Sequence, residues 1–143
     1  MSTVLSFDLG TTAFKAAVVE TDRGAARAIA RRPTPFREPA PGRVEMPAAE
    51  VLATVDGLAA DLRKADPAAM DQVAAVSFSS QTNSFLLLDG DDEPVTPVVV
   101  WSDRRAVDDG IELPLADDPR FTAETGLPIV SGEFMAAKLL WLA

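Results

Sequence analysis

The sequence contains neither cysteine nor histidine, and both absences limit its chemistry. Without cysteine, the chain can form no disulfide and no thiolate zinc site. Without histidine, it lacks the commonest general base and the commonest ligand of transition metals. Any acid–base chemistry therefore falls to Asp, Glu or Lys, and any bound metal is expected to be an ion such as magnesium, which prefers oxygen ligands.

Basic residues are also scarce, since 13 Lys and Arg stand against 22 Asp and Glu and give a net charge of −9. This balance argues against a nucleic-acid partner, which needs a basic face. It does not exclude a nucleotide, because local dipoles and a metal can hold phosphates. The sequence has no apolar run of membrane-spanning length and no signal-peptide pattern at its start. We therefore expect a cytoplasmic protein without a membrane partner.

The composition is that of a globular chain, with 48% hydrophobic and 24% charged residues in a length of 143 that suits one domain. Three consecutive antiparallel strands joined by short turns are predicted first, at Val4–Phe7, Ala13–Glu20 and Ala25–Thr34. A loop rich in proline follows them, with Pro33, Pro35, Pro39 and Pro41.

Residues 47–64 change to a helical period. Their apolar residues recur on one face, at Val51, Leu52, Val55, Leu58, Ala59 and Leu62. Pro47 suits the first helical turn, and Asp66-Pro67 ends the helix.

Beyond the helix, a buried strand is predicted at Val73–Phe78 and a second hairpin between Phe85–Leu88 and Val95–Trp101. The remainder is expected to be mostly helical, including Met135–Leu142. The order β-β-β-α-β is not the alternating βαβ of a Rossmann domain. It predicts an α/β fold with a mixed sheet and flanking helices, of the ribonuclease-H-like kind found in the actin, Hsp70 and sugar-kinase ATPases.

A polar turn, Asp8-Leu9-Gly10-Thr11-Thr12, separates the first two strands, and Lys15 follows it. Gly10 lets the backbone turn tightly and lets a ligand approach. Successive N–H groups and two hydroxyls could bind an anion, while Asp8 could hold magnesium. The same residues would equally suit an ordinary hairpin turn, since short motifs occur by chance. The turn is not a Walker A loop, because it has no G-K-[ST] and a strand follows it.

Four other segments accompany Phe7–Lys15 in order along the chain: Gly42–Glu45, Val76–Gln81, Pro97–Arg105 and Lys138–Leu142. Together the five resemble motifs of the FGGY family of carbohydrate kinases. The first is similar to the family's first phosphate motif, and the next resembles its G-x-x-E segment. The third is similar to the strand before the sugar-contacting loop, and the last two resemble its P-x-x-x-W-x-D-x-R and K-L-L-W-L segments.

This resemblance implies a phosphotransferase that uses ATP and Mg²⁺ to phosphorylate a sugar or polyol. Asp8 would position the metal, and the phosphates would lie near Gly10, Thr11, Thr12 and Lys15. The substrate would be contacted by Gln81, Thr82, Asn83, Trp101 and Asp103.

In the substrate loop, xylulokinases resemble one another in carrying Met-His, and glycerol kinases in carrying Arg-Glu. This chain has Thr82-Asn83 there, so neither xylulose nor glycerol can simply be assigned as its substrate. Trp101 is expected either as an apolar wall of the pocket or as a core aromatic. Asp103 is expected to accept a hydrogen bond from a substrate hydroxyl.

Neighbouring charged residues have simpler expectations. Arg104 and Arg105 are expected in surface ion pairs, and Glu45 at a helix start. Lys138 and Trp141 are expected as packing residues and residues of a solvated helix.

No residue of this chain matches the family's catalytic base, which is expected beyond residue 143, as are the second lobe and the adenosine-binding segment. Residues 1–143 would then be a partial N-terminal domain, inactive alone, whose partners are a C-terminal lobe and a second copy of the chain. Two alternatives are another ATPase of the superfamily and a non-catalytic sugar- or nucleotide-binding regulatory module. The Trp101 segment disfavours the former, and intact Asp8, Thr11 and Thr12 disfavour the latter.

Overall fold

The computed structural model describes residues 3–114 and 118–143 of the chain. The chain folds into two compact units, and each unit combines two separate stretches of sequence. The first unit contains Met1–Pro35 and Pro47–Gln81, and the second contains Phe36–Met46 and Thr82–Ala143. The chain therefore leaves the first unit after the N-terminal strands, returns to it for a helix and one more strand, and then leaves again.

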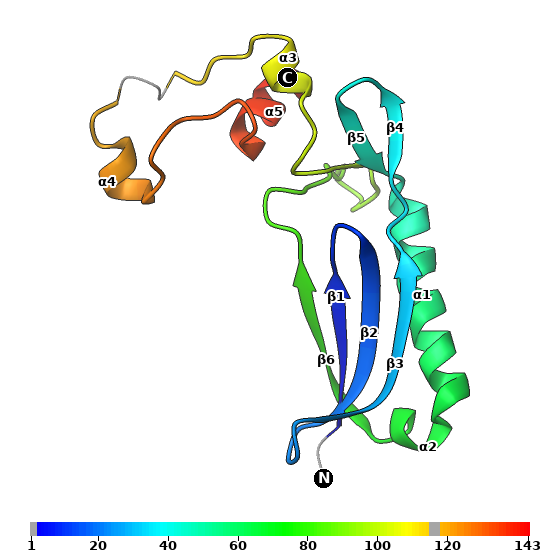
Figure 1. Cartoon of the computed structure of the whole chain (residues 1–143). Coiled ribbons are helices and arrows are strands. Elements are labelled where there is room, and N and C mark those ends of the chain that lie inside the picture. Colours follow the sequence, from blue (N-terminus) through cyan, green and yellow to red (C-terminus); the bar gives the residue numbers. More distant parts are fainter. Residues whose placement is uncertain (1–2, 115–117) are drawn as a thin grey trace. The chain divides into compact units, whose positions relative to one another are not determined.

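The first unit contains a four-stranded sheet in the order β3-β2-β1-β6 (Figure 1). Strand β1 (Thr3–Leu9) pairs antiparallel with β2 (Ala13–Glu20) and parallel with β6 (Val73–Ser80), while β3 (Ala25–Pro33) pairs antiparallel with β2. The predicted strands are confirmed to within a few residues. The predicted order β-β-β-α-β also holds within this unit, apart from one short additional helix.

Helix α1 (Ala48–Ala65) packs against β2 and β3 and covers one face of the sheet. Its apolar stripe is the one that the sequence predicts, although only Leu58 and Leu62 are fully buried, while Leu52 is exposed. Burying each of these leucines contributes about 1.5–3 kcal/mol. The helix ends at Asp66, whose side chain accepts a hydrogen bond from the Ala69 N–H and so caps α2 (Pro67–Met70).

Strand β6 is at the edge of the sheet and is mostly exposed. Phe78 stacks on Phe7 of β1, with ring centroids 5.0 Å apart, and still leaves 60% of its surface exposed. Val76 is 55% exposed. Among the described residues, no strand pairs with the outer edge of β6.

The second unit contains a three-stranded antiparallel sheet in the order β4-β5-β7. Strands β4 (Arg37–Ala40) and β5 (Arg43–Met46) form a hairpin where the sequence predicted only a proline-rich loop. The prediction was wrong because β4 is an edge strand, and an edge strand tolerates a residue without an N–H such as Pro39.

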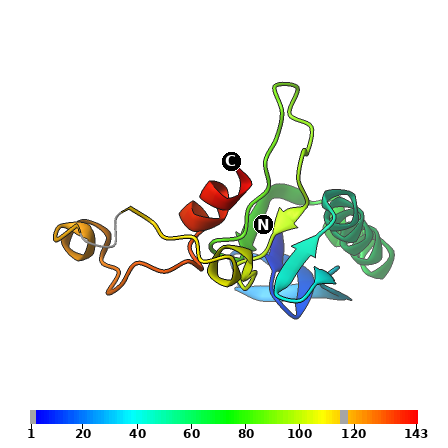
Figure 2. The ribbon, with the colours of Figure 1, turned by 90° about the horizontal axis from the view of Figure 1, so that it is seen from above.

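The second predicted hairpin exists as a long narrow loop rather than as two regular strands (Figure 2). Phe85 pairs with Val99 and Leu88 with Pro94, but only β7 (Val98–Val99) is a strand, and it pairs with β5. Pro94 and Pro97 cannot donate to a ladder, which explains the irregularity.

The remainder is less helical than predicted, because glycines and prolines interrupt it. Its described residues form α3 (Arg105–Asp108), α4 (Phe121–Thr125) and α5 (Met135–Leu142), the last as predicted. Ala106 and Ala137, from α3 and α5, share a small buried core with Leu113. None of the described helices has the length and hydropathy needed to cross a membrane.

Gly42 makes the turn between β4 and β5 with φ of 75°, which favours glycine, and an added Cβ would lie 2.4 Å from an Asp108 carboxylate oxygen. We therefore expect Gly42→Ala to lower the free energy of unfolding by about 1–2 kcal/mol. Urea unfolding would measure the loss. Gly90→Ala is the matched control, because Gly90 has no positive φ and open space around it; an equal loss in both variants would contradict this account.

Candidate functional site

The predicted phosphate turn joins β1 to β2, and the strand register places Asp8 directly opposite Lys15. The Lys15 Nζ donates a hydrogen bond to Asp8 Oδ2 at 2.9 Å, and each side chain is 52% exposed. Thr11 and Thr12, at the tip of the turn, are exposed as well. The turn thus presents two hydroxyls, a carboxylate and an ammonium group to solvent.

The Gly10 carbonyl anchors this turn to two other strands of the same unit. It accepts hydrogen bonds from Thr34 Oγ1 at 2.9 Å, just after β3, and from Gln81 Nε2 at 3.1 Å, just after β6. A Cβ on Gly10 would lie 3.1 Å from the Ala13 carbonyl oxygen, so a larger residue would force the turn to shift. Gln81, expected to contact the substrate, therefore uses one side of its amide to hold the phosphate turn.

Asp8 can take part in holding a magnesium ion, but not alone. Among the described residues, no group of three or more acidic side chains is placed to hold a metal ion. Mg²⁺ is commonly bound through one or two carboxylates, water and the phosphates of its ligand. Asp8 commits one oxygen to Lys15 and has no described hydrogen-bond partner on the other. This donor set fits a metal that arrives with a phosphate ligand.

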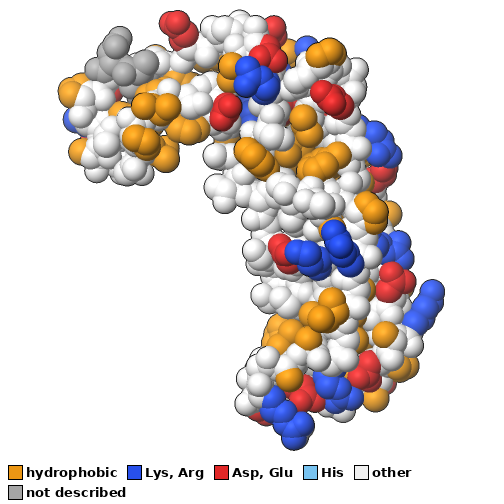
Figure 3. Space-filling model, in the orientation of Figure 1, with side chains coloured by type: hydrophobic (Ala, Val, Ile, Leu, Met, Phe, Trp, Pro, Cys, Tyr) orange, Lys and Arg blue, Asp and Glu red, His pale blue; other side chains and the backbone are white. Residues whose placement is uncertain are grey.

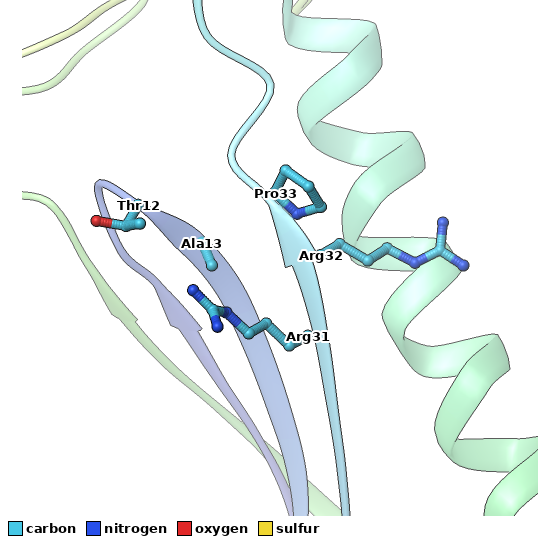
Figure 4. Close-up of a pocket in the computed structure, with 5 residues that line it drawn as sticks. All are labelled: Thr12, Ala13, Arg31, Arg32 and Pro33. Carbon is cyan, nitrogen blue, oxygen red and sulfur yellow. The ribbon is translucent and has the colours of Figure 1, made fainter.

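A hollow of about 300 Å³ lies beside the turn and is lined by Thr12, Ala13, Arg31, Arg32 and Pro33 (Figure 4). Arg32 turns toward α1, where its Nε and a terminal nitrogen bind Asp61 Oδ2 at 3.0 and 2.8 Å. Arg31 points the other way, across β2 (Figure 4). Arg31 belongs to none of the motifs found in the sequence, and the alternation of side chains along β3 is the signal that distinguishes it from Arg32.

The second unit brings the rest of the predicted substrate loop next to Trp101. Thr82 and Asn83 are exposed, and Asn83 has a φ of 62°, a conformation that asparagine tolerates. The next residue, Ser84, accepts a hydrogen bond on its Oγ from the Trp101 N–H at 3.0 Å. This bond joins the loop to Trp101.

Lys138 of α5 holds Trp101 from the other side. Its side chain is fully buried, and its Nζ donates to the carbonyls of Val100 at 3.0 Å and Trp101 at 2.7 Å. Burial lowers the pKa of Lys138. The expectation of a solvated-helix lysine was therefore wrong. Trp101 itself is 45% exposed, so it is not a core aromatic, and its backbone is held at both ends while much of its indole faces solvent.

Asp103 is the residue whose position differs most from expectation, because its side chain is completely buried. Oδ2 accepts hydrogen bonds from the Val44 N–H at 2.7 Å and from Arg105 at 2.9 Å, and Oδ1 accepts from the Arg105 N–H and Nε at 3.0 and 2.8 Å. Both oxygens are therefore engaged within the protein, and Asp103 offers no free acceptor to a substrate hydroxyl. Burial alone would raise the pKa of Asp103, but the hydrogen bonds from Arg105 and Val44 outweigh it and lower the pKa.

Arg105 completes this buried cluster. It also donates to Glu45 Oε1 of β5 at 2.5 Å, and its hydrogen bond to Asp103 is the main cause that raises its pKa. Arg105 is thus not a surface ion-pair residue, and Glu45 lies in a strand rather than at a helix start. Arg104, in contrast, is exposed and pairs with Asp108 at 3.1 Å, as predicted.

Trp141 closes the cluster from α5. Its ring centroid lies 5.0 Å from the guanidinium carbon of Arg43 and 5.2 Å from that of Arg105, within the range of cation–π attraction. Its Nε1 donates to Asp109 Oδ2 at 2.6 Å. Trp141 is therefore a packing residue, as predicted, that also has two charged neighbours.

Comparison with known proteins agrees with the motifs. Residues 3–143 match the N-terminal domain of the FGGY family of carbohydrate kinases. The chain is 36% identical to the glycerol kinase of Aromatoleum aromaticum, covering 99% of this chain and 29% of that protein. A xylulose kinase structure from Brucella ovis superposes with a TM-score of 0.87 at 30% identity, and one from Rhodospirillum rubrum with 0.82 at 26%.

Each of those two structures is covered over 29% of its length, and the chain over 99% and 98% of its own. The chain thus spans less than a third of the length of these relatives. These structural neighbours confirm the predicted fold class, the α/β fold shared by sugar kinases, actin and Hsp70.

The buried Asp103–Arg105 pair has an exposed counterpart with the same local geometry, since Asp118 accepts from the N–H, Nε and a terminal nitrogen of Arg120. We expect Asp103→Asn to lower the free energy of unfolding by about 3 kcal/mol, because it removes one partner of a buried ion pair. Asp118→Asn should cost about 1 kcal/mol or less. Urea unfolding of both variants near neutral pH would measure the difference, and equal losses would contradict the assigned role.

The stabilisation by Asp103 should also depend on pH. The pKa of Asp103 in the folded chain lies below the usual value of 3.8. The ionised Asp103 carboxylate therefore stabilises the folded state fully above pH 3.8, and this stabilisation is lost as the pH falls through the folded pKa. The wild-type chain should therefore lose stability in acid more steeply than Asp103→Asn.

Proposed function

Because the chain belongs to the FGGY family of carbohydrate kinases, we propose that it forms the N-terminal part of an enzyme that transfers the γ-phosphate of ATP to a hydroxyl of a sugar or polyol. The observation that carries this proposal is the exposed turn after β1. There, a carboxylate, an ammonium group and two hydroxyls lie around a glycine whose carbonyl is anchored from two other parts of the first unit.

In this proposal the turn binds the phosphates of ATP. Backbone N–H groups, the hydroxyls of Thr11 and Thr12 and the Lys15 ammonium group supply donors to phosphate oxygens. Asp8 would help to hold a magnesium ion, and a bound ion would supply positive charge near the transferring phosphate. The hydrogen bonds from Thr34 and Gln81 to the Gly10 carbonyl hold the turn in place, so little conformational entropy is lost when it binds phosphate.

The substrate side rests on Trp101 and the loop before Ser84. The half-exposed indole offers an apolar wall for the carbon face of a sugar or polyol, and Thr82 and Asn83 offer groups that both donate and accept hydrogen bonds. Asp103 takes a different role from the expected one. Buried against Arg105, it holds the chain after Trp101 in place rather than binding the substrate itself.

Phosphate transfer to a hydroxyl also requires a base to accept the hydroxyl proton. Asp103, the carboxylate nearest in sequence to Trp101, cannot serve because both its oxygens are bonded within a buried ion pair. We therefore propose that the 143-residue chain binds ligands but does not transfer phosphate by itself, and that the base belongs to another part of a complete kinase.

Calorimetric titration of the chain with Mg²⁺–ATP tests the phosphate role. We expect binding that depends on Mg²⁺, and Asp8→Asn should weaken it by about tenfold or more while leaving the weaker binding of ATP in EDTA unchanged. A coupled assay with a panel of sugars and polyols should detect no turnover by the chain alone.

Asp22→Asn serves as the control, since Asp22 is an exposed aspartate in the turn between β2 and β3. A loss of Mg²⁺-dependent affinity in this variant equal to that of Asp8→Asn would contradict the assignment. Turnover by the isolated chain would refute the proposal that the base is elsewhere. Sugar binding without nucleotide binding would instead favour a non-catalytic sugar-binding module.

Tryptophan fluorescence tests the substrate role, because the chain has only two tryptophans. In a Trp141→Phe background, emission comes from Trp101, and we expect it to change with saturation when the substrate sugar or polyol is added. In a Trp101→Phe background, Trp141 should give no such change. A response confined to Trp141 would contradict the placement of the substrate at Trp101.

A further inference from the structure

Arg31 lies at the end of a row of charged residues that crosses three strands of the first unit. The register pairs Asp8 of β1 with Lys15 of β2, and Lys15 with Arg31 of β3. Side chains directly opposite each other on neighbouring strands point to the same face of the sheet. Acidic and basic side chains accordingly gather over the sheet in the space-filling view (Figure 3).

This arrangement is unfavourable without a ligand, because two cations face each other on neighbouring strands. Asp8 neutralises Lys15 through their ion pair. Elsewhere on β3, Arg27 is paired with Glu20 and Asp66, and Arg32 with Asp61. For Arg31, the part of the chain that the structure describes supplies no ion-pair or hydrogen-bond partner. Its guanidinium is therefore an uncompensated charge beside a cation.

The same guanidinium is directed toward the phosphate turn. Arg31 and Thr12 line one hollow of about 300 Å³, a volume at the lower end of small-molecule sites that suits part of a ligand better than a whole nucleotide. In Figure 4 the Arg31 side chain extends across β2 on the side of Ala13, whereas Arg32 extends toward α1.

We propose that Arg31 is a further phosphate-binding residue of this site. Its planar guanidinium binds two oxygens of the phosphate chain of a nucleoside triphosphate, which neutralises the facing cations and occupies the hollow beside Thr12. This inference rests on the proposed phosphate role of the turn and adds a second cation to Lys15. If Mg²⁺ bound at Asp8, the Asp8 carboxylate would neutralise Lys15 less. The phosphate chain would then interact with both Lys15 and Arg31.

The test uses inorganic tripolyphosphate with Mg²⁺ as a probe that has phosphates but no base or sugar. Calorimetric titrations would compare the wild-type chain with Arg31→Gln, Arg31→Lys and Arg23→Gln at two salt concentrations. We expect Arg31→Gln to weaken binding about tenfold. Arg31→Lys should recover only part of the loss, because an ammonium group cannot make the paired contact. Arg23→Gln makes the same change of net charge in the turn between β2 and β3, at the other end of these strands from Thr12, and should bind within about twofold of wild type.

Two results would overturn the assignment of Arg31 alone. One is tripolyphosphate binding by the wild type that Arg31→Gln leaves unchanged. The other is an equal loss in the Arg31→Gln and Arg23→Gln variants, which would indicate an unspecific effect of net charge. A wild-type chain that binds no tripolyphosphate at all would overturn the phosphate role of the turn and this inference with it. Thermal unfolding of each variant confirms that it is folded under the titration conditions.

Discussion

A buried arginine organises the second unit, and the position of Trp101 depends on it. Arg105 binds Asp103 through two nitrogens and its own N–H, reaches Glu45 on β5, and lies against the ring of Trp141. Removing a guanidinium from water is costly, so such a residue is stable only where several acceptors meet it. The cluster therefore couples a strand, the segment after Trp101 and the C-terminal helix. Lys138 extends this coupling, because it joins α5 to the carbonyls of Val100 and Trp101.

In the first unit, side chains hold the turn that is proposed to bind phosphates, at its glycine, Gly10. Its carbonyl receives the Thr34 and Gln81 side chains, so the ends of β3 and β6 both fix the same peptide. The polar groups of this turn remain exposed to solvent. They are the Asp8 carboxylate, the Lys15 ammonium group and the hydroxyls of Thr11 and Thr12. In each unit, buried or partly buried polar contacts hold the backbone, while groups proposed to meet ligands are exposed to solvent.

The relatives include glycerol kinases and xylulose kinases, so the function proposed for the chain names a class of substrate rather than one compound. The chain is similar both to glycerol kinases and to xylulose kinases, and it matches less than a third of their length. Its own substrate loop presents Thr82 and Asn83, and its Trp101 presents an indole. These groups suit a polyhydroxy compound without selecting one, because hydroxyl and amide groups bind any well-placed hydroxyl.

The sequence by itself determined the strands at the N-terminus, the amphipathic helix, the polar turn at Asp8–Thr12 and the family, because alternation, helical period and short motifs are local properties of a chain. It did not reveal that Asp103, Arg105 and Lys138 are buried, since their partners lie far away in sequence: Glu45 is 60 residues from Arg105, and Val100 is 38 from Lys138. Alternation along β3 places the adjacent Arg31 and Arg32 on opposite faces, but the sequence could not show that only Arg32 meets an acidic partner, Asp61. The tertiary structure decided which charges are paired within the fold and which, like Arg31, have no ion-pair partner among the described residues, because burial and pairing depend on residues that only folding brings together.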